Sequence, residues 1–420
     1  MTEALSTSDA DIGGQATAAV EGFLARVDQT EPTLRAFRQI DANRLRSEAA
    51  ALDTVPAHRR GPLYGMLVAV KEVFDVAGYE CGWGTPIHDG RQPFSDAWAV
   101  ARLRDAGALI AGITVSSEYA MSRVGPTSNP FDAARSPGAS SQGSAAAVGA
   151  GLAPAALGTQ TIGSIIRPAA YCGCIGAKPT WGAIPATGAM VLSELLDHVG
   201  FMAADPDTAA AVLDALMPMA DGDGDALAAQ CGVLLPWYAE GMMPEVSGAL
   251  TLAARKLTDA GLDVRDDVLP QWIADREAEV LDRLLSHDMA AHHGGDYDRH
   301  GEMMSERVRS YIERGRRVSA AEYDAAMKQR SEMADALDEW IGDRVLLMPA
   351  TVGLAPLLVD GTGPREPQRL WSLTGQPAMT VPVNRVQGLP VGVQVVARRG
   401  ADRRVLAVVR SLYEATRSKS

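Results

Sequence analysis

The feature that most constrains how this chain folds is its longest uncharged segment, residues 136–166, which consists mainly of Ser, Gly and Ala. A segment of this length raises the question of a membrane-spanning helix. Pro137, Pro154 and scattered glycines would interrupt such a helix. Small uncharged residues instead allow backbones to approach one another closely within a core. We therefore expect the segment to be buried inside a soluble protein.

The overall composition is that of a folded, acidic protein. Of its 420 residues, 47% are hydrophobic and 22% are charged, which excludes general disorder. A net charge of −13 argues against a nucleic-acid partner. Four cysteines in so long a chain form no disulfide framework, and the N-terminal residues do not have the pattern of a secretory signal. These features predict a cytoplasmic protein.

Hydrophobic patterning in the first half predicts alternating helices and strands. Residues 14–60 indicate two amphipathic helices, and the apolar run 66–70 has the length and β-branching of a buried strand. A helix is expected over 95–104, capped by the Ser and Asp at its start, and a strand over 109–114. This alternation favours a sheet that is covered by helices on both faces.

The second half begins with a region of different character, residues 206–340, which is helical in pattern, charged and irregular. The C-terminal region, 341–420, is predicted to complete the sheet with strands at 345–349, 378–383 and 391–396 and a helix over 401–416. The sequence contains no internal repeat and no linker rich in Pro, Gly or Ser. We therefore predict the fold class α/β, as one large domain over residues 1–420.

Common metal, phosphate and nucleophile motifs do not occur in the sequence. HExxH, the P-loop pattern and the GxSxG nucleophile elbow are all missing. Residues 221–225 alternate Asp and Gly, but the following positions lack the Gly and Glu of a calcium loop, so a solvated turn is expected. Four histidines at 287, 292, 293 and 300 lie in a charged helical pattern, which favours a surface location. No metal site and no cofactor are predicted.

Two Ser/Gly loops, 136–144 and 158–168, are the strongest candidates for chemistry. A Gly-rich loop that ends on a serine exposes consecutive backbone N–H groups, as an oxyanion hole requires. Lys71 closes the predicted strand 66–70, where burial could convert it into a neutral base. From composition alone, a purely structural loop with a surface lysine is an equally good interpretation.

Seven ordered motifs resolve this choice. They are Val68–Glu72, GASSQGSAAAVGAG (138–151), GTQTIGSIIRPA (158–169), Gly176–Thr180, Leu196–Gly200, Leu373–Pro377 and Gly388–Gln394. Together they resemble the amidase signature family of serine hydrolases. The resemblance covers residues 61–205 and 340–410 and implies the family's α/β fold with a mixed sheet.

The resemblance implies a Ser–Ser–Lys triad in the core region 61–205. Ser164 would be the acylated nucleophile, Ser140 the bridging serine that follows a cis peptide bond, and Lys71 the base. The oxyanion would be held by backbone N–H groups of the loop that contains the nucleophile: Thr161, Ile162, Gly163 and Ser164.

The chain also departs from the family pattern. Gln160 replaces the usual Asp, Gln142 and Ile162 replace glycines, and Arg167 is shifted by one position. This TQTxGSxIRPA variant resembles a malonamidase-like subgroup. We expect Ile162 to form an apolar wall beside the substrate. Arg167 either binds a substrate carboxylate or braces the loop.

The resemblance implies hydrolysis of C–N bonds in small amides, with carbamates (urethanes) and anilides as further candidate substrates. The region 206–340 would face the substrate. The partners expected are a small-molecule amide or carbamate, with no nucleic acid and no membrane, and a homodimer is left open. The alternative is the amidase-type subunit of a tRNA-dependent amidotransferase complex, which the acidic charge balance disfavours.

Overall fold

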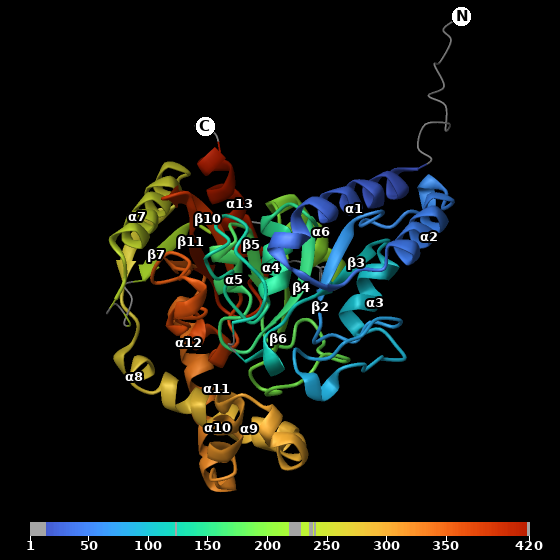
Figure 1. Cartoon of the computed structure of the whole chain (residues 1–420). Helices are drawn as coiled ribbons and strands as arrows, with labels where there is room; N and C mark the ends of the chain where they lie inside the picture. Colours follow the sequence, from blue (N-terminus) through green and yellow to red (C-terminus); the bar gives the residue numbers. More distant parts are fainter. Residues whose placement is uncertain (1–13, 122–123, 218–227, 235–237, 239–240, 418–420) are drawn as a thin grey trace, which may run out of the picture.

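The structure is a computed structural model that describes residues 14–121, 124–217, 228–234, 238 and 241–417. In this part of the chain, strands from both halves of the sequence form one sheet in the order β1-β3-β2-β4-β6-β5-β10-β11-β9-β7-β8 (Figure 1). The strands are β1 Phe37–Gln39, β2 Leu67–Lys71, β3 Leu109–Thr114, β4 Ala155–Gln160, β5 Ile175–Lys178, β6 His198–Ala203, β7 Gln230–Leu234, β8 Asp263–Asp267, β9 Val345–Pro349, β10 Ala378–Val386 and β11 Leu389–Val396.

The sheet is mixed, which confirms the predicted α/β fold class. Strand β2 pairs in parallel with β3 and β4, whereas β4 pairs antiparallel with β6. Beyond β6, the sheet runs antiparallel through β5, β10, β11 and β9. It is parallel again from β9 through β7 to β8. Because β2 and β4 are neighbours, the ends of the lysine strand and of the strand that precedes the second Ser/Gly loop lie together.

Helices cover both faces of the sheet and bury separate hydrophobic clusters. Helices α1, α2 and α4 pack on one face, and α3, α6 and α13 pack on the other. Side chains of β2 alternate between the two: Leu67 and Ala69 face α4, and Val68 and Val70 face the opposite cluster. The helices are α1 Gln15–Leu34, α2 Ala42–Asp53, α3 Trp98–Asp105, α4 Gln142–Gly149, α5 Ile166–Tyr171, α6 Pro206–Leu216, α7 Pro244–Asp259, α8 Gln271–Ala274, α9 Glu277–His300, α10 Glu306–Gly315, α11 Ala320–Ile341, α12 Glu366–Thr374 and α13 Asp402–Arg417.

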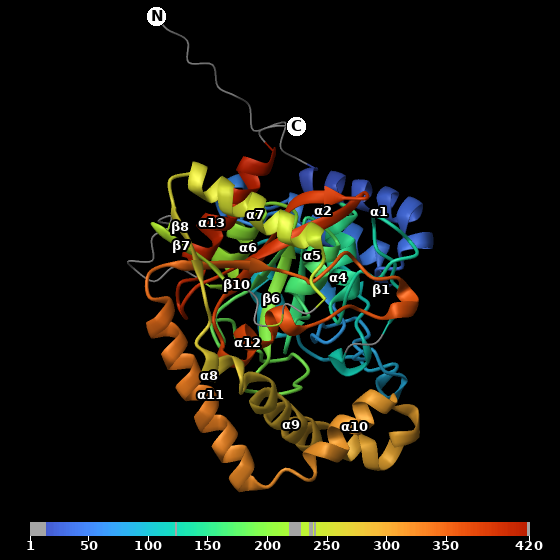
Figure 2. The ribbon, with the colours of Figure 1, turned by 90° about the vertical axis from the view of Figure 1, so that its left-hand side faces the viewer.

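The region 206–340 is not purely helical, contrary to the expectation from its sequence. Helices α9, α10 and α11 do form a group that projects below the sheet (Figures 1 and 2). However, β7 and β8 extend the sheet at its edge. Strand β8 reads DVRDD, and most of its side chains are exposed or half-buried. An edge strand of this kind has no strong hydrophobic pattern, which explains why the sequence does not reveal it.

The two predicted N-terminal helices are confirmed as α1 and α2, with the unpredicted short strand β1 between them. Two smaller expectations were wrong. Asp96 does not cap α3, which begins at Trp98; its carboxylate instead accepts a hydrogen bond from the Ala77 N–H (2.8 Å) and pairs with Arg104 (3.0 Å). His293 is buried rather than on the surface, with Nε2 2.8 Å from the Val191 carbonyl oxygen. The Asp/Gly run 221–225 lies outside the described residues.

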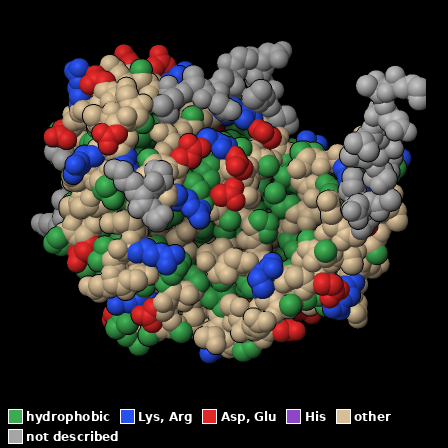
Figure 3. Space-filling model, turned by 90° about the horizontal axis from the view of Figure 1, so that it is seen from above, with side chains coloured by type: hydrophobic (Ala, Val, Ile, Leu, Met, Phe, Trp, Pro, Cys, Tyr) green, Lys and Arg blue, Asp and Glu red, His purple; other side chains and the backbone are tan. Residues whose placement is uncertain are grey.

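The surface carries charges of both signs. In the face seen in Figure 3, acidic and basic side chains are interspersed around a more hydrophobic centre. Among the described residues, no helix combines the length and the apolar character that a membrane span requires. The segment 136–166 is divided in the structure between α4, β4 and the loops beside them, and nearly all of it is buried.

A close backbone contact of α4 generates a stability prediction. A Cβ atom at Gly143 would lie 2.2 Å from the Ala36 carbonyl oxygen and 2.6 Å from the Val115 backbone nitrogen. Gly143→Ala must therefore push backbone segments apart and should lower the free energy of unfolding by about 1–3 kcal/mol. Urea denaturation measures this loss. Gly248→Ala, in α7, is the matched control, since its Cβ has open space and Ala favours helices by about 1 kcal/mol. Equal free energies of unfolding for the two variants would contradict the close backbone contact at Gly143.

Candidate active site

Lys71 is the last residue of β2 and is completely buried. Its alternation with Leu67 and Ala69 directs it toward the face on which α4 packs. The Nζ atom lies 2.8 Å from Ser140 Oγ and 2.9 Å from Thr159 Oγ1. The sequence prediction named Ser140 as the partner of Lys71 but did not anticipate Thr159, which comes from the neighbouring strand β4. Lys71 is thus held between two hydroxyl groups.

Burial changes the protonation of this lysine. Desolvation lowers the pKa of Lys71 to about 7, although the carboxylates of Asp197 and Glu72 act in the opposite direction. A buried ammonium loses its hydration, and two hydroxyl groups replace only part of it. A substantial fraction of Lys71 is therefore neutral at physiological pH. A neutral amine 2.8 Å from a serine hydroxyl can accept its proton.

Ser140 lies in the first Ser/Gly loop and is also fully buried. The peptide bond between Ala139 and Ser140 is cis, as the family resemblance implied. Gly138 precedes it with φ 83°, and a Cβ at Gly138 would lie 2.8 Å from the Pro168 Cα. Only glycine combines that backbone conformation with so close an approach. The loop holding Ser140 is therefore packed directly against the start of α5.

Ser164 lies at the outer end of this group. It is 8% exposed, whereas Lys71 and Ser140 are inaccessible. The Ser141 N–H donates to the Ser164 carbonyl oxygen at 3.4 Å, which joins the two Ser/Gly loops through their backbones. Lys71 and Ser140 are therefore in direct contact, and Ser164 is joined to them through the backbone of the residue that follows Ser140. The serine nearest to solvent is the one predicted to meet the substrate.

The loop between β4 and α5 presents backbone donors beside Ser164. Within the described residues, the N–H groups of Ile162, Gly163 and Ser164 donate to no other group. Gln160 accepts the next two N–H groups, those of Ile165 and Ile166, at 2.8 and 3.0 Å through its Oε1 atom. The side chain that replaces the family's Asp thus caps α5. The Thr161 hydroxyl donates to the carboxylate of Asp197 at 2.6 Å.

Arg167 has the contacts of a loop brace. Its side chain is buried, and its guanidinium donates to the carbonyl oxygens of Gly363 (2.6 Å), Pro364 (3.4 Å) and Ala139 (2.6 Å). Burial lowers the pKa of Arg167 to about 10. The contact with Ala139 fixes the peptide that precedes Ser140. These contacts match the bracing alternative, and a role in binding a substrate carboxylate stays a prediction.

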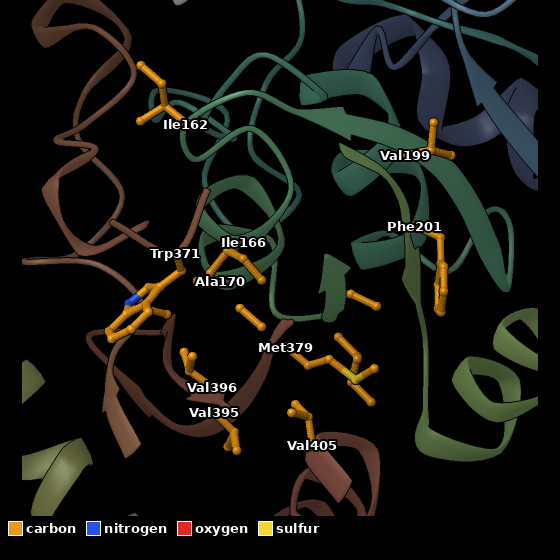
Figure 4. Packing of buried hydrophobic residues seen from close by; sticks show 14 of the residues in the cluster. Ile162, Ile166, Ala170, Val199, Phe201, Trp371, Met379, Val395, Val396 and Val405 are labelled. Carbon is orange, nitrogen blue, oxygen red and sulfur yellow. The ribbon is translucent and has the colours of Figure 1, made fainter. Parts of the chain in front are cut away.

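Ile162 and Gln142, the other departures from the family pattern, occupy different settings. Ile162 is 6% exposed, lies on the loop and belongs to the same buried hydrophobic cluster as Ile166 and Trp371 (Figure 4). Its proposed role as an apolar wall stays a prediction. Gln142 begins α4, and its Oε1 accepts a hydrogen bond from the Gly125 N–H at 3.2 Å. That contact ties the residues before the first Ser/Gly loop to the helix.

Asp197 is a site residue that sequence reasoning missed. Its Oδ1 accepts the Thr161 hydroxyl at 2.6 Å, and its Oδ2 accepts the N–H groups of Leu192 (2.7 Å) and Ser193 (3.1 Å). Desolvation raises the pKa of Asp197 to about 6, against the effect of these donors and of Lys71. The motif Leu196–Gly200 contained this residue, but its role depends on the pairing of β4 with β6.

The helical region reaches the site through α9. Ser117 donates its N–H to the Ser140 carbonyl oxygen at 3.3 Å, and two residues later the Tyr119 hydroxyl donates to Asp296 of α9 at 2.9 Å. His88 lies 2.8 Å from the same carboxylate oxygen. A segment that contacts the bridging serine is therefore anchored to the region 206–340.

This fold and its relatives define the class: the protein is an amidase, an enzyme that hydrolyses C–N bonds other than peptide bonds. The family described as Amidase matches residues 18–406, which is most of the chain. The chain therefore belongs to the amidase family. The finer assignment to a malonamidase-like subgroup is not established by this match.

Related proteins include both stand-alone enzymes and components of a complex. The matching subunit of the glutamyl-tRNA(Gln) amidotransferase from Nitratidesulfovibrio vulgaris is 31% identical, over 93% of this chain and 91% of its own. A solved amidase is 31% identical with a TM-score of 0.86, covering 95% of this chain and 96% of its own. The peptide amidase of Stenotrophomonas maltophilia is 26% identical with a TM-score of 0.82, covering 96% and 94%. The amidotransferase relatives leave the expected exclusion of nucleic acid unsupported.

The lowered pKa of Lys71 generates a prediction about pH. If neutral Lys71 is the base, kcat/KM should rise about tenfold per pH unit at acidic pH and level off above a midpoint near 7. Protonation below that pH removes the acceptor, so the loss is on the acidic side. Lys71→Met should lower kcat by at least about 10²-fold on the plateau above pH 7, where the wild-type lysine is neutral. A folded Lys71→Met variant with a wild-type pH profile would show that another group is the base.

The contacts of Arg167 generate a second prediction. An ammonium group cannot span the Gly363 and Ala139 carbonyl oxygens, so Arg167→Lys should lower stability by about 1–3 kcal/mol. It should also reduce kcat/KM alike for neutral amides and for half-amides of diacids. Thermal unfolding and turnover of both substrate types measure these effects. Arg46→Lys, at an exposed ion pair with Glu21, is the control. A loss restricted to acidic substrates would identify Arg167 as a carboxylate-binding residue instead.

Proposed function

We propose that this protein hydrolyses small-molecule amides through an acyl-enzyme on Ser164, with Ser140 as the proton relay and Lys71 as the base. The observation that supports this most directly is the 2.8 Å contact of Ser140 Oγ with a buried lysine of lowered pKa. A serine hydroxyl is a weak nucleophile unless a nearby group accepts its proton. Burying this lysine costs stability, because the amine that is protonated in the unfolded chain loses its hydration on folding. Buried groups with a shifted pKa are typical of catalytic sites.

The reaction proceeds in two halves. Ser164 Oγ attacks the amide carbonyl while its proton passes to Ser140, and the proton of Ser140 passes to Lys71. The oxyanion is held by N–H groups of the loop from Thr161 to Ser164. Ser140 then protonates the leaving amine and regains a proton from Lys71, so the C–N bond breaks and an ester to Ser164 remains. Water attacks this ester by the same proton route and releases the carboxylic acid. No step needs a metal or organic cofactor.

The substrate class is a finer proposal. Carbamates, anilides and half-amides of diacids are the candidates, the last because of the malonamidase-like TQTxGSxIRPA variant. The region 206–340 is proposed to face the substrate, because α9 binds Tyr119 on the segment that also contacts Ser140. Action in the cytoplasm and assembly as a homodimer stay predictions.

The second candidate function is that of a component of a glutamyl-tRNA(Gln) amidotransferase. It is favoured by relatives of that name at 31% identity, which cover about nine-tenths of both chains. The two functions differ in what the purified chain does alone. A stand-alone amidase turns over small amides without a partner. A chain that is inactive on every small amide, and active only after a second protein copurifies, would favour the amidotransferase.

Labelling of the nucleophile tests the proposal directly. A fluorophosphonate should add its mass to the peptide that contains Ser164, and Ser164→Ala should abolish both labelling and turnover of short aliphatic amides, anilides, half-amides and carbamates. Mass spectrometry after proteolysis locates the adduct. Ser247→Ala, on α7 and outside the site, should label like the wild type. Labelling of Ser140 or Ser144 would contradict the assignment of the nucleophile.

A further inference from the structure

Helix α12 lies directly against the loop that contains the oxyanion donors. Gln368, on this helix, is fully buried, and its amide points at Gly163: a Cβ at Gly163 would lie 2.6 Å from Gln368 Oε1. One turn later, the Ser372 hydroxyl lies 2.6 Å from the Ile162 carbonyl oxygen. Both helix residues come from a part of the sequence about 200 positions away from the loop. The conformation of the loop therefore depends on α12.

Ser372 takes part in a chain of hydrogen bonds with defined directions. Gln160 Nε2 lies 3.0 Å from Ser372 Oγ, and Ser372 Oγ lies 2.6 Å from the Ile162 carbonyl oxygen. Gln160 Oε1 accepts from the N–H groups of Ile165 and Ile166. The carbonyl can only accept, so the Ser372 proton goes to Ile162. The Ser372 oxygen must then accept from the Gln160 amide.

This directionality depends on glutamine at position 160. A carboxylate at that position could accept the two N–H groups of α5, but it has no proton to donate. The Ser372 hydroxyl would then donate to the carboxylate and release the Ile162 carbonyl. Gln160 replaces the Asp that is usual at this position of the family pattern. The amide therefore both caps α5 and orients the Ser372 hydroxyl.

Holding the Ile162 carbonyl also fixes the next N–H group. The bond between Ile162 and Gly163 is a trans peptide, in which the C=O and the following N–H point in opposite directions. With the Ile162 carbonyl bound to α12, the Gly163 N–H is turned away from α12. The next peptide is fixed in a similar way, because the Gly163 carbonyl accepts from the Arg167 N–H at 3.2 Å.

We propose that Ser372, oriented by Gln160, is a positioning residue that fixes the Gly163 N–H as an oxyanion donor. The inference rests on the proposed function, because it concerns the loop that would stabilise the Ser164 adduct. Prefixed donors stabilise the transition state more than the bound amide, since charge develops on the oxygen only as the tetrahedral intermediate forms. Loss of the Ser372 hydroxyl should therefore affect the chemical step and leave substrate binding nearly unchanged.

The test is Ser372→Ala, assayed with an amide that the wild type hydrolyses and with a boronic acid that mimics the tetrahedral adduct. We expect kcat to fall by about 10- to 100-fold with KM within twofold, and the boronic acid to bind more weakly by a similar factor. Thr374→Val is the matched control. It removes another buried hydroxyl of α12, whose contacts are the Leu370 carbonyl oxygen at 2.7 Å and the Gln376 Oε1 atom. This variant should keep wild-type kcat and inhibitor affinity.

Gln160→Glu tests the direction of the hydrogen bonds from residue 160 through Ser372 to Ile162. It keeps an oxygen that can accept the N–H groups at the start of α5. It should reproduce the fall in kcat, and the double variant Gln160→Glu/Ser372→Ala should be no slower than the more impaired single variant, because both changes remove the same interaction. Unchanged kcat and inhibitor affinity in Ser372→Ala, or multiplicative losses in the double variant, would overturn the inference. Failure of the proposed function has a different signature. If Ser164 is not the nucleophile, Ser164→Ala retains its turnover, and this result does not depend on the effect of Ser372→Ala.

Discussion

The burial of Lys71 is the constraint on which the rest of the site depends. An amine can lose its hydration and remain in place only where neighbouring groups leave room for it and supply hydroxyl partners. Small residues on its face of the sheet, such as Ala69 on β2, allow α4 to pack closely there. Ser140 and Thr159 then provide the two contacts of Nζ. The small, uncharged residues of 136–166 provide the dry and closely packed surroundings that this buried lysine needs.

The loops around the lysine are fixed by residues from distant parts of the chain. Arg167 holds the carbonyl before Ser140, Gln160 caps α5, and Ser372 holds the carbonyl of Ile162. Each interaction ends on a backbone group, so each one sets a peptide orientation instead of merely adding contact area. An oxyanion site made of N–H groups needs this kind of support, since a backbone donor has no rotamer by which to adjust.

The proposed catalytic residues and the charged, irregular region 206–340 lie in different parts of the fold. The residues of the proposed triad come from β2 and from the loops around α4 and α5, whereas α9, α10 and α11 form a projecting group that meets the site through Tyr119 and Asp296. Such a division fits a family in which solved relatives with TM-scores above 0.8 include a peptide amidase and a chain from a complex linked to the origins of an s-triazine catabolic enzyme. A shared scaffold can serve different substrates when the covering elements change.

The sequence by itself determined the α/β class, the buried lysine strand and the two Ser/Gly loops, because these follow from local periodicity and from the order of the motifs. It also placed the last three strands and the final helix within a few residues. It did not predict the edge strand β8, whose charged side chains hide its pairing, or the roles of Thr159, Asp197 and Ser372. Those roles depend on which strands are neighbours and on where α12 packs. Only the tertiary structure decides such long-range contacts, since no local pattern encodes a partner about 200 residues away.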